Sequence, residues 1–162
     1  MPTSIVIVTP LPADASEQAV ISSLHNHDIY IQTTCPQLVS RRLVSGTPGL
    51  DLPCAYEIVD TRAFGEMKFG LTLTNVEEGI DALVEGKTPT GSIKVLSEWR
   101  VRAGKLEEVV EIESNLITKM IVKKNVEKGH PEFHQYAIRD SFYISPSPTC
   151  PHYPGIPQEI IL

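Results

Sequence analysis

The sequence predicts an α+β fold in which a curved antiparallel sheet wraps around one long C-terminal helix and leaves a central cavity. Two observations carry this prediction. Strand, helix, meander and long helix follow one another in that order, and the apolar period changes from two to about 3.6 residues near residue 114. A chain of 162 residues suits one domain with one core. A cavity on the order of several hundred Å³ is the usual site for a small apolar molecule.

The N-terminal part is expected to contain one strand and at least one helix. The β-branched run from Ile5 to Val8 predicts the strand. Asp14 as N-cap, with a glutamate three residues later, predicts a helix from about Asp14 to Leu24. The segment from 29 to 39 is ambiguous, and a second short helix is one interpretation of it.

Alternating apolar and polar residues predict the strands of the sheet. In the clearest stretch, Val95, Trp99 and Val101 share one face, while charged residues occupy the other. The same parity in the next stretch places Glu108 on the buried face beside Val110. The predicted stretches are 54–62, 67–74, 80–84, 93–102 and 106–113, with 41–45 as a further start of the sheet.

The last helix is expected from Asn115 to Lys128, because basic residues gather in its last turns and Gly129 follows as a stop. Its apolar stripe should face the sheet and comprises Leu116, Ile117, Met120 and Ile121. Residues 1–137 then form the domain. The proline-rich residues 138–162 form a tail that is too apolar for a pure linker, so we expect it to pack on or near the domain.

Composition excludes several classes of partner. A net charge of −6 and a pI near 5.3 disfavour nucleic acid and anionic membrane surfaces, because both need a basic face. No stretch approaches the roughly 18 apolar residues of a membrane span, so we expect no membrane insertion. The N-terminus lacks the features of a signal peptide, which predicts a cytoplasmic protein. Cys35, Cys54 and Cys150 are then expected to be reduced thiols.

Inward-facing side chains are the candidates for a site. Tyr56, Phe69, Trp99 and Met120 are predicted to line the cavity and bind an apolar substrate; the alternative is plain core. Tyr56, Asp60 and Glu108 are the catalytic candidates. A carboxylate among apolar neighbours would have a raised pKa and would act as a hydrogen-bond donor or general acid. The alternative is a strand end that turns each carboxylate to water.

The histidines give weaker signals. His130 and His134 have the i, i+4 spacing of helical metal ligands, but Gly129 and Pro131 argue against a continuous helix there. His25 and His27 lack further ligands with suitable spacing. No hydrolase, dinucleotide or phosphate-binding motif is present either. We therefore expect no metal and no cofactor.

Three short motifs carry a resemblance to a known family: Thr9-Pro10-Leu11-Pro12, Leu24-His25-Asn26-His27 and the basic amphipathic helix from Leu116 to Lys128. With the order of elements, they make the chain similar to the helix-grip (START, SRPBCC) superfamily of lipid-transfer domains, the birch pollen allergen family and aromatic polyketide cyclases. Within it, the chain resembles a group of small fungal proteins of mostly unassigned function. The likeness covers residues of about 4 to 130. It implies a helix-grip fold with a ligand-binding cavity and transfers no catalytic residue.

The first functional hypothesis is a fungal secondary-metabolism enzyme, a cofactor-independent cyclase or isomerase. It would confine an apolar polyene, terpenoid or polyketide intermediate and promote cyclisation or rearrangement, including Diels–Alder addition. The second hypothesis is a non-catalytic carrier of an apolar, lipid-like molecule. A homodimeric interaction domain, with its cavity filled by side chains, is the third.

Overall fold

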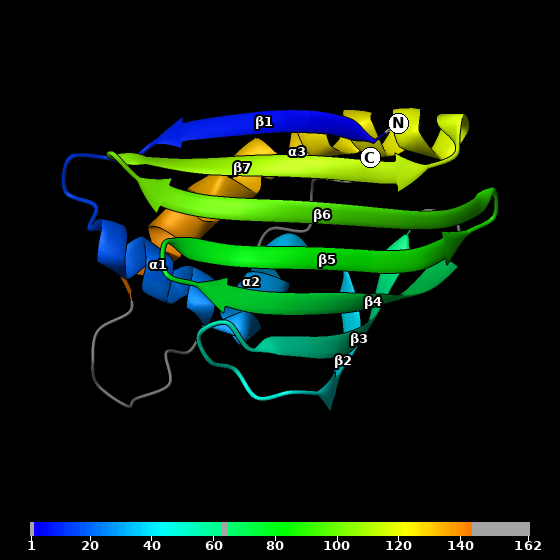
Figure 1. The fold of residues 1–162 in the computed structure, drawn as a ribbon, viewed down its shortest axis with the longest axis horizontal. Helices are drawn as coiled ribbons and strands as arrows, with labels where there is room; N and C mark the ends of the chain where they lie inside the picture. The colour runs from blue at the N-terminus through cyan, green and yellow to red at the C-terminus, as the bar shows by residue number, and fades with distance from the viewer. Residues whose placement is uncertain (1, 63–64, 144–162) are drawn as a thin grey trace.

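The computed structural model describes residues 2–62 and 65–143. Within these ranges the chain forms a seven-stranded sheet and three helices, all of which lie on one side of the sheet (Figure 1). In chain order the elements are β1 (Thr3–Pro10), α1 (Glu17–His25), α2 (His27–Thr34), β2 (Leu38–Ser45), β3 (Pro53–Arg62), β4 (Gly65–Val76), β5 (Gly79–Thr88), β6 (Gly91–Arg102), β7 (Lys105–Ser114) and α3 (Leu116–Ser141). The predicted α+β architecture is confirmed.

The sheet is antiparallel throughout, with the strand order β1-β7-β6-β5-β4-β3-β2. Strand β1 pairs with the last strand, so that Ile7 lies opposite Glu108. Trp99 of β6 lies opposite Glu108 on its other side. Because opposite residues of antiparallel strands point to the same face, Ile7, Glu108 and Trp99 share the concave face that the helices cover.

Two clusters of apolar side chains form the core. The larger one joins α1 and α2 to the middle of the sheet and includes Leu24, Tyr30, Ile58, Leu73 and Trp99. The smaller one joins α3 to the β1–β7 edge and consists of Ile5, Val110, Ile112 and Val126, with Ile7, Val95 and Val122 packed against it. Figure 1 shows the same arrangement, with α3 running from behind β1 toward α1.

The last helix is longer than predicted, because α3 continues through Gly129 and Pro131 to Ser141. A proline inside a helix removes one backbone hydrogen bond. Pro131 is exposed, whereas His134 and Ile138 beyond it are buried, so packing outweighs that loss. The tail predicted from residue 138 thus begins inside a helix. Its residues 144–162, which include Cys150, lie outside the described ranges.

The predicted inward stripe of α3 is wrong. Leu116, Ile117, Met120 and Ile121 are between 57% and 74% exposed. The helix packs instead through Thr118, Val122 and Val126, which follow one another at intervals of four residues. The sequence therefore contains two apolar stripes, and the β-branched one fits against the side chains of β1 and β7.

The N-terminal helices differ from the prediction in their boundaries. Ser16 caps α1 by accepting a hydrogen bond from the backbone N–H of Ala19, so Asp14 is not the N-cap. The second short helix exists as α2, and the Asn26 side chain caps it. None of the helices in the described ranges is long and apolar enough to cross a membrane.

Candidate functional site

A completely buried carboxylate lies between two histidines under α3. Glu108 of β7 has no exposed side-chain surface. One carboxylate oxygen lies 2.8 Å from His130 Nδ1, and the other lies 3.2 Å from His134 Nε2. The other ring nitrogen of His134, Nδ1, lies 2.9 Å from the Thr9 hydroxyl. Thr9, His134, Glu108 and His130 form one connected hydrogen-bond network, called the Glu108 network below.

Three elements position this network. The parity of β7 turns Glu108 toward the helices, as the sequence predicts. His130 and His134 lie one turn apart on α3, so both reach the same carboxylate. Thr9 comes from β1, and the Trp99 ring packs against the His134 ring with centroids 4.7 Å apart. The i, i+4 spacing of the two histidines is the sequence signal for this pair, and the helix continues through Pro131 despite the proline.

Glu108 is ionised at neutral pH. Burial alone would raise the pKa of this carboxyl group, but the hydrogen bonds and charges of His130 and His134 lower it below its ordinary value. The prediction of a raised pKa is therefore wrong, because it omitted both histidines. An ionised carboxylate accepts hydrogen bonds from both rings. With the Nε2–H of His134 directed at the carboxylate, its Nδ1 is left to face the Thr9 hydroxyl at 2.9 Å.

His130 is the member of the network that water can reach. Its side chain is 20% exposed, and no described residue forms a hydrogen bond with its Nε2. A buried carboxylate that binds Nδ1 fixes the orientation and the tautomer of the ring, which leaves Nε2 on the outer side. The geometry therefore suits His130 Nε2 for accepting and returning a proton.

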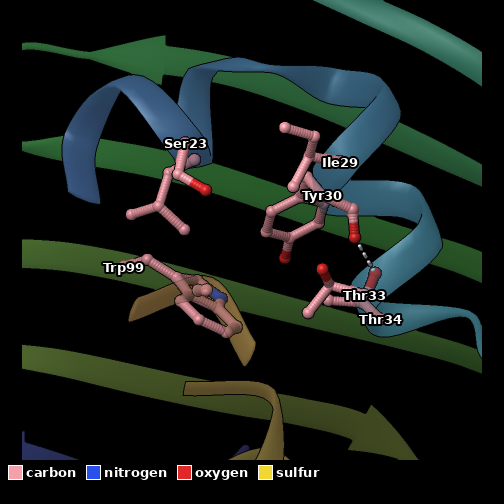
Figure 2. A pocket seen from close by; sticks show the side chains of 8 residues that line it. Ser23, Ile29, Tyr30, Thr33, Thr34 and Trp99 are labelled. Carbon is pink, nitrogen blue, oxygen red and sulfur yellow. Dashed lines mark hydrogen bonds between the residues drawn. The ribbon is translucent and has the colours of Figure 1, made fainter. Parts of the chain in front are cut away.

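Among the described residues, the space beside Trp99 is a small pocket and not the predicted cavity. Figure 2 shows Tyr30 of α2 pointing toward Trp99 across a small pocket that Ser23 also borders. Its volume is about 10 Å³, which is room for no more than one water molecule. Trp99 is only 1% exposed and is part of the core. The space under α1 and α2 is filled by side chains.

Tyr30 and Trp99 form the aromatic wall of this core. Their rings make an edge-to-face contact with centroids 5.7 Å apart. Burial raises the pKa of Tyr30 well above its ordinary range, and the nearby Glu108 charge adds to this rise. The Trp99 indole N–H makes no hydrogen bond of ordinary geometry to a described residue, yet it lies near enough to Tyr30 to oppose this rise in pKa. Tyr30 therefore stays protonated beside the carboxylate.

A wider groove of about 630 Å³ lies at one end of the sheet. The β5–β6 hairpin and the end of β7 line this groove. Asn115, the N-cap of α3, borders it too. None of the predicted substrate-binding residues lines it. Its lining comprises Glu85, Gly86, Thr90, Gly91, Ser92, Ile93, Lys94, Glu113, Ser114 and Asn115.

Part of the concave face remains accessible beside the core. Phe69, Val84 and Val95 belong to three neighbouring strands and are half-buried. Their registers place them on the face that carries Leu71 and Ile112, since Leu71 lies opposite Val84 and Val95 opposite Ile112. These side chains offer an apolar surface that the described helices do not seal.

A second histidine network, called the His27 network below, joins the α1–α2 region to the sheet. His27 Nδ1 lies 2.8 Å from the Tyr56 hydroxyl, and its Nε2 lies 3.0 Å from Asn75 Oδ1. Burial lowers the pKa of His27, which keeps the ring neutral. The Tyr56 hydroxyl then donates to Nδ1, and the Nε2–H donates to Asn75. His25 Nε2 binds the carbonyls of Val76 and Gly79 at the β4–β5 turn.

The three predicted catalytic residues do not meet in one place. Tyr56 is engaged by His27, and Glu108 lies four strands away on β7. Asp60 is 2% exposed and forms a salt bridge with Arg62 at 2.7 Å, while its second oxygen has no partner among the described residues. Met120, predicted to bind substrate, is 65% exposed and points out of the core. The residues that sequence reasoning missed are Thr9, His27, His130 and His134.

The two described cysteines and the described metal-binding residue types offer no further centre. Burial raises the pKa of the Cys35 thiol to about 11 and also raises that of Cys54, so neither is an activated nucleophile. Across residues 2–62 and 65–143, no group of three or more histidine, cysteine or acidic side chains is arranged to hold a metal ion.

Comparisons with known proteins concern the fold. No family model matches this sequence, and no curated protein matches it. Ara h 8.0201 is similar in structure, with a TM-score of 0.60 at 10% identity over 86% of this chain and 99% of that one. The Zhui aromatase/cyclase from Streptomyces sp. R1128 has a TM-score of 0.56 at 8% identity, and the match covers 88% of this chain and 93% of that one. The di-domain ARO/CYC BexL from the BE-7585A biosynthetic pathway has a TM-score of 0.57 at 12% identity, and the match covers 86% of this chain and 50% of that one.

The chain has the helix-grip fold. At these identities the likeness establishes the fold and not the activity. The resemblance to helix-grip proteins is thus confirmed at the level of structure. Nothing in the comparisons points to the fungal group or to a Diels–Alder reaction.

Proposed function

We propose that this protein is a helix-grip enzyme that binds an apolar carbonyl compound and promotes its cyclisation or isomerisation by acid–base chemistry. The observation that carries the proposal is the Glu108 network, in which a fully buried, ionised carboxylate holds a partly exposed imidazole. Polyketide and terpenoid intermediates are the substrate class, since their carbonyl groups acidify the neighbouring C–H bonds.

The proposed step is a proton transfer that needs no oxidant or reductant. His130 Nε2 takes a proton from the carbon next to the carbonyl, and Glu108 stabilises the resulting imidazolium. In cyclisation, the enolate carbon attacks a second carbonyl carbon, whose C=O π bond opens to an alkoxide that takes the proton back from the imidazolium. In isomerisation, the same imidazolium returns the proton to another carbon of the enolate. Both routes restore neutral His130 and close the proton balance. A correctly placed general base contributes roughly 10²–10⁴ in rate.

The half-buried apolar residues of the concave face support the binding part of the proposal. Phe69, Val84 and Val95 present apolar surface on the same face as Glu108. Such a surface holds the apolar body of a substrate, while one polar group determines its orientation. Two structural neighbours are named as aromatase/cyclases, which supports cyclisation as the reaction class.

A base-sensitive probe tests the acid–base role without knowledge of the natural substrate. The ring of 5-nitrobenzisoxazole opens when a base removes one carbon-bound proton, and the phenolate product is followed by absorbance. We expect His130→Asn and Glu108→Gln to reduce the protein-dependent rate by about tenfold or more. Glu107→Gln is the matched control, because Glu107 is the neighbouring carboxylate and pairs with Arg102. Circular dichroism checks that each variant is folded.

Two results would reject the acid–base proposal. One is a wild-type rate no greater than that of free imidazole at equal concentration. The other is an unchanged rate in folded His130→Asn protein.

A non-catalytic carrier is the second candidate function, and the accessible Phe69 side chain favours it. Binding of the apolar dye 1-anilinonaphthalene-8-sulfonate tests this alternative. Phe69→Gln should weaken dye binding, while Val6→Gln, at an exposed position of β1, should not. Dye binding without any His130-dependent rate would establish the carrier and reject the enzyme.

A further inference from the structure

The first two turns of α3 expose four large apolar side chains. Leu116, Ile117, Met120 and Ile121 are 74%, 64%, 65% and 57% exposed. Their i, i+1, i+4, i+5 spacing places them on one side of the helix, away from the stripe that packs on the sheet. We call these four residues the α3 tip. None of them belongs to either core cluster.

Lysines continue the same exposed side of the helix. Lys124 follows Met120 by four residues, and Lys128 follows Lys124 by four. Lys123, Lys124 and Lys128 are all exposed. The single acidic residue between 116 and 128 is Glu127, which lies 3.8 Å from Lys123 in a solvent-exposed pair. Such a pair is weak, so the helix surface keeps a positive charge.

The edge strand β2 exposes apolar residues too, but its charges differ. Val39, Leu43 and Val44 are about half exposed. Each cation between them has a carboxylate beside it, Arg41 at 2.5 Å from Asp28 and Arg42 at 3.4 Å from Glu57, so these residues carry no excess of positive charge. The α3 tip therefore differs from β2 in having a basic surface next to its apolar one.

We propose that the α3 tip docks on a membrane surface that contains anionic lipid. An exposed helix with large apolar residues on one side and lysines beside them has the composition of helices that lie in the membrane interface. The apolar residues enter the headgroup boundary, and the lysines meet lipid phosphates.

The net charge of −6 does not prevent this docking. Charges are screened over about 8–10 Å at physiological salt. Residues 116 to 128 span roughly 18 Å of helix, so the lysines of this helix lie within about two screening lengths of the α3 tip. The expectation that excluded anionic membranes rested on overall charge and did not consider this helix.

Docking at the α3 tip would also orient the rest of the molecule. Asn115 precedes the tip and borders the groove of about 630 Å³ at the end of the sheet. Membrane contact through the tip brings this groove to the lipid surface. Lys105 and the β6–β7 hairpin lie at the opposite end of β7 and face away.

Vesicle co-sedimentation of the full 162-residue chain tests the proposal. The probes are vesicles of phosphatidylcholine alone and of phosphatidylcholine with phosphatidylserine. We expect binding to the second kind, weakened about tenfold or more by the double variant Met120→Gln, Ile121→Gln. Lys124→Gln combined with Lys128→Gln should weaken it at least about fivefold and reduce its sensitivity to salt. The matched controls are Val6→Gln with Val8→Gln for the apolar change and Lys105→Gln for the charge.

Three results would overturn the proposal. The first is binding that the controls weaken as much as the α3 variants do. The second is a dimer in analytical ultracentrifugation that Met120→Gln, Ile121→Gln dissociates, with no vesicle binding by the wild type, because the tip would then contact a second copy. The third is vesicle binding by a chain that ends at Tyr143 and none by the full chain. That result would mean that residues 144–162 cover the α3 tip in the full chain.

Discussion

The two histidine networks are built from similar parts and reach opposite electrostatic states. Each joins a helical histidine to a polar side chain of the sheet at 2.8 Å, His27 to Tyr56 and His130 to Glu108. His27 is neutral and has a partner on both ring nitrogens. Glu108 is ionised, and the outer nitrogen of His130 has no described partner. The partner therefore determines whether a buried histidine fixes the structure or is available for chemistry.

Desolvation explains why the partner matters so much. Burial penalises any charge, and neutral Tyr56 and Asn75 give His27 no compensation. Two imidazoles that donate hydrogen bonds to Glu108 do compensate, because they stabilise its charged form. The His27 network behaves as a clamp between α2 and the sheet. The Glu108 network carries a charge that the fold must maintain, so its loss should be more costly.

Removal of Glu108 should have the largest effect on stability. Glu108→Ala leaves two histidine N–H groups without their acceptor inside the core, and we expect it to lower the free energy of unfolding by about 3 kcal/mol. Urea denaturation measures the change. Glu107→Ala, on the opposite face of the same strand, should change it by no more than about 0.5 kcal/mol. Equal effects of the two substitutions would contradict a special role for the buried carboxylate.

Breaking the neutral clamp should cost less. Tyr56→Phe removes the hydroxyl that donates to His27 Nδ1, and we expect a loss of about 1–2 kcal/mol in the free energy of unfolding. Tyr136→Phe is the matched control, because its hydroxyl binds Glu132 on the surface of α3 at 2.7 Å. It should stay within about 0.5 kcal/mol. If Tyr56→Phe costs more than Glu108→Ala, the order of the two networks is reversed.

Acid should weaken the two networks in different pH ranges. The pKa of folded His27 lies below its ordinary 6.5, so below pH 6.5 the unfolded chain binds a proton that the folded chain does not. Stability therefore falls as the pH drops from 6.5 toward the folded pKa. The pKa of folded Glu108 lies below 4.5, so its contribution is present above pH 4.5 and is lost as the pH falls through its folded value.

Urea midpoints measured from pH 8 to pH 3 separate these ranges. His27→Gln should remove the part of the decline that begins near pH 6.5 and leave the part that begins near pH 4.5. Glu108→Gln should do the reverse. A wild-type curve that matches His27→Gln between pH 6.5 and 5 would show that His27 is not held neutral.

Sequence reasoning succeeded where one face of a strand is buried. From Cys54 to Asp60 every second residue is buried, and the observed register keeps the predicted parity. It failed on α3, where two apolar stripes compete. Val122 and Val126 face the sheet because they fit the side chains of β1 and β7, and that contact depends on a strand more than a hundred residues away.

The candidate site was predicted only in part, because strand parity is a local pattern and the contact of α3 with the sheet is not. Parity alone placed Glu108 inside. The sign of its pKa shift required knowledge that α3 continues past Pro131 and brings His130 and His134 to it. A local rule about proline gave the wrong answer because buried residues beyond it stabilise the helix. The filled space around Trp99 could not be foreseen from one-sided alternation, which is the same for a cavity and for a core.

The smallest expected effect distinguishes the partly exposed His130 of the Glu108 network from the fully buried His134. His130→Asn removes one donor to the carboxylate, but this side is 20% exposed, so water replaces the donor. We expect a loss of about 1 kcal/mol in the free energy of unfolding. His134→Asn should cost at least about twice as much, because His134 is fully buried, binds both Thr9 and Glu108 and packs on Trp99. Urea denaturation at pH 7 measures both losses. Equal losses would mean that His130 is sealed from solvent, and such a ring would have no route to a substrate.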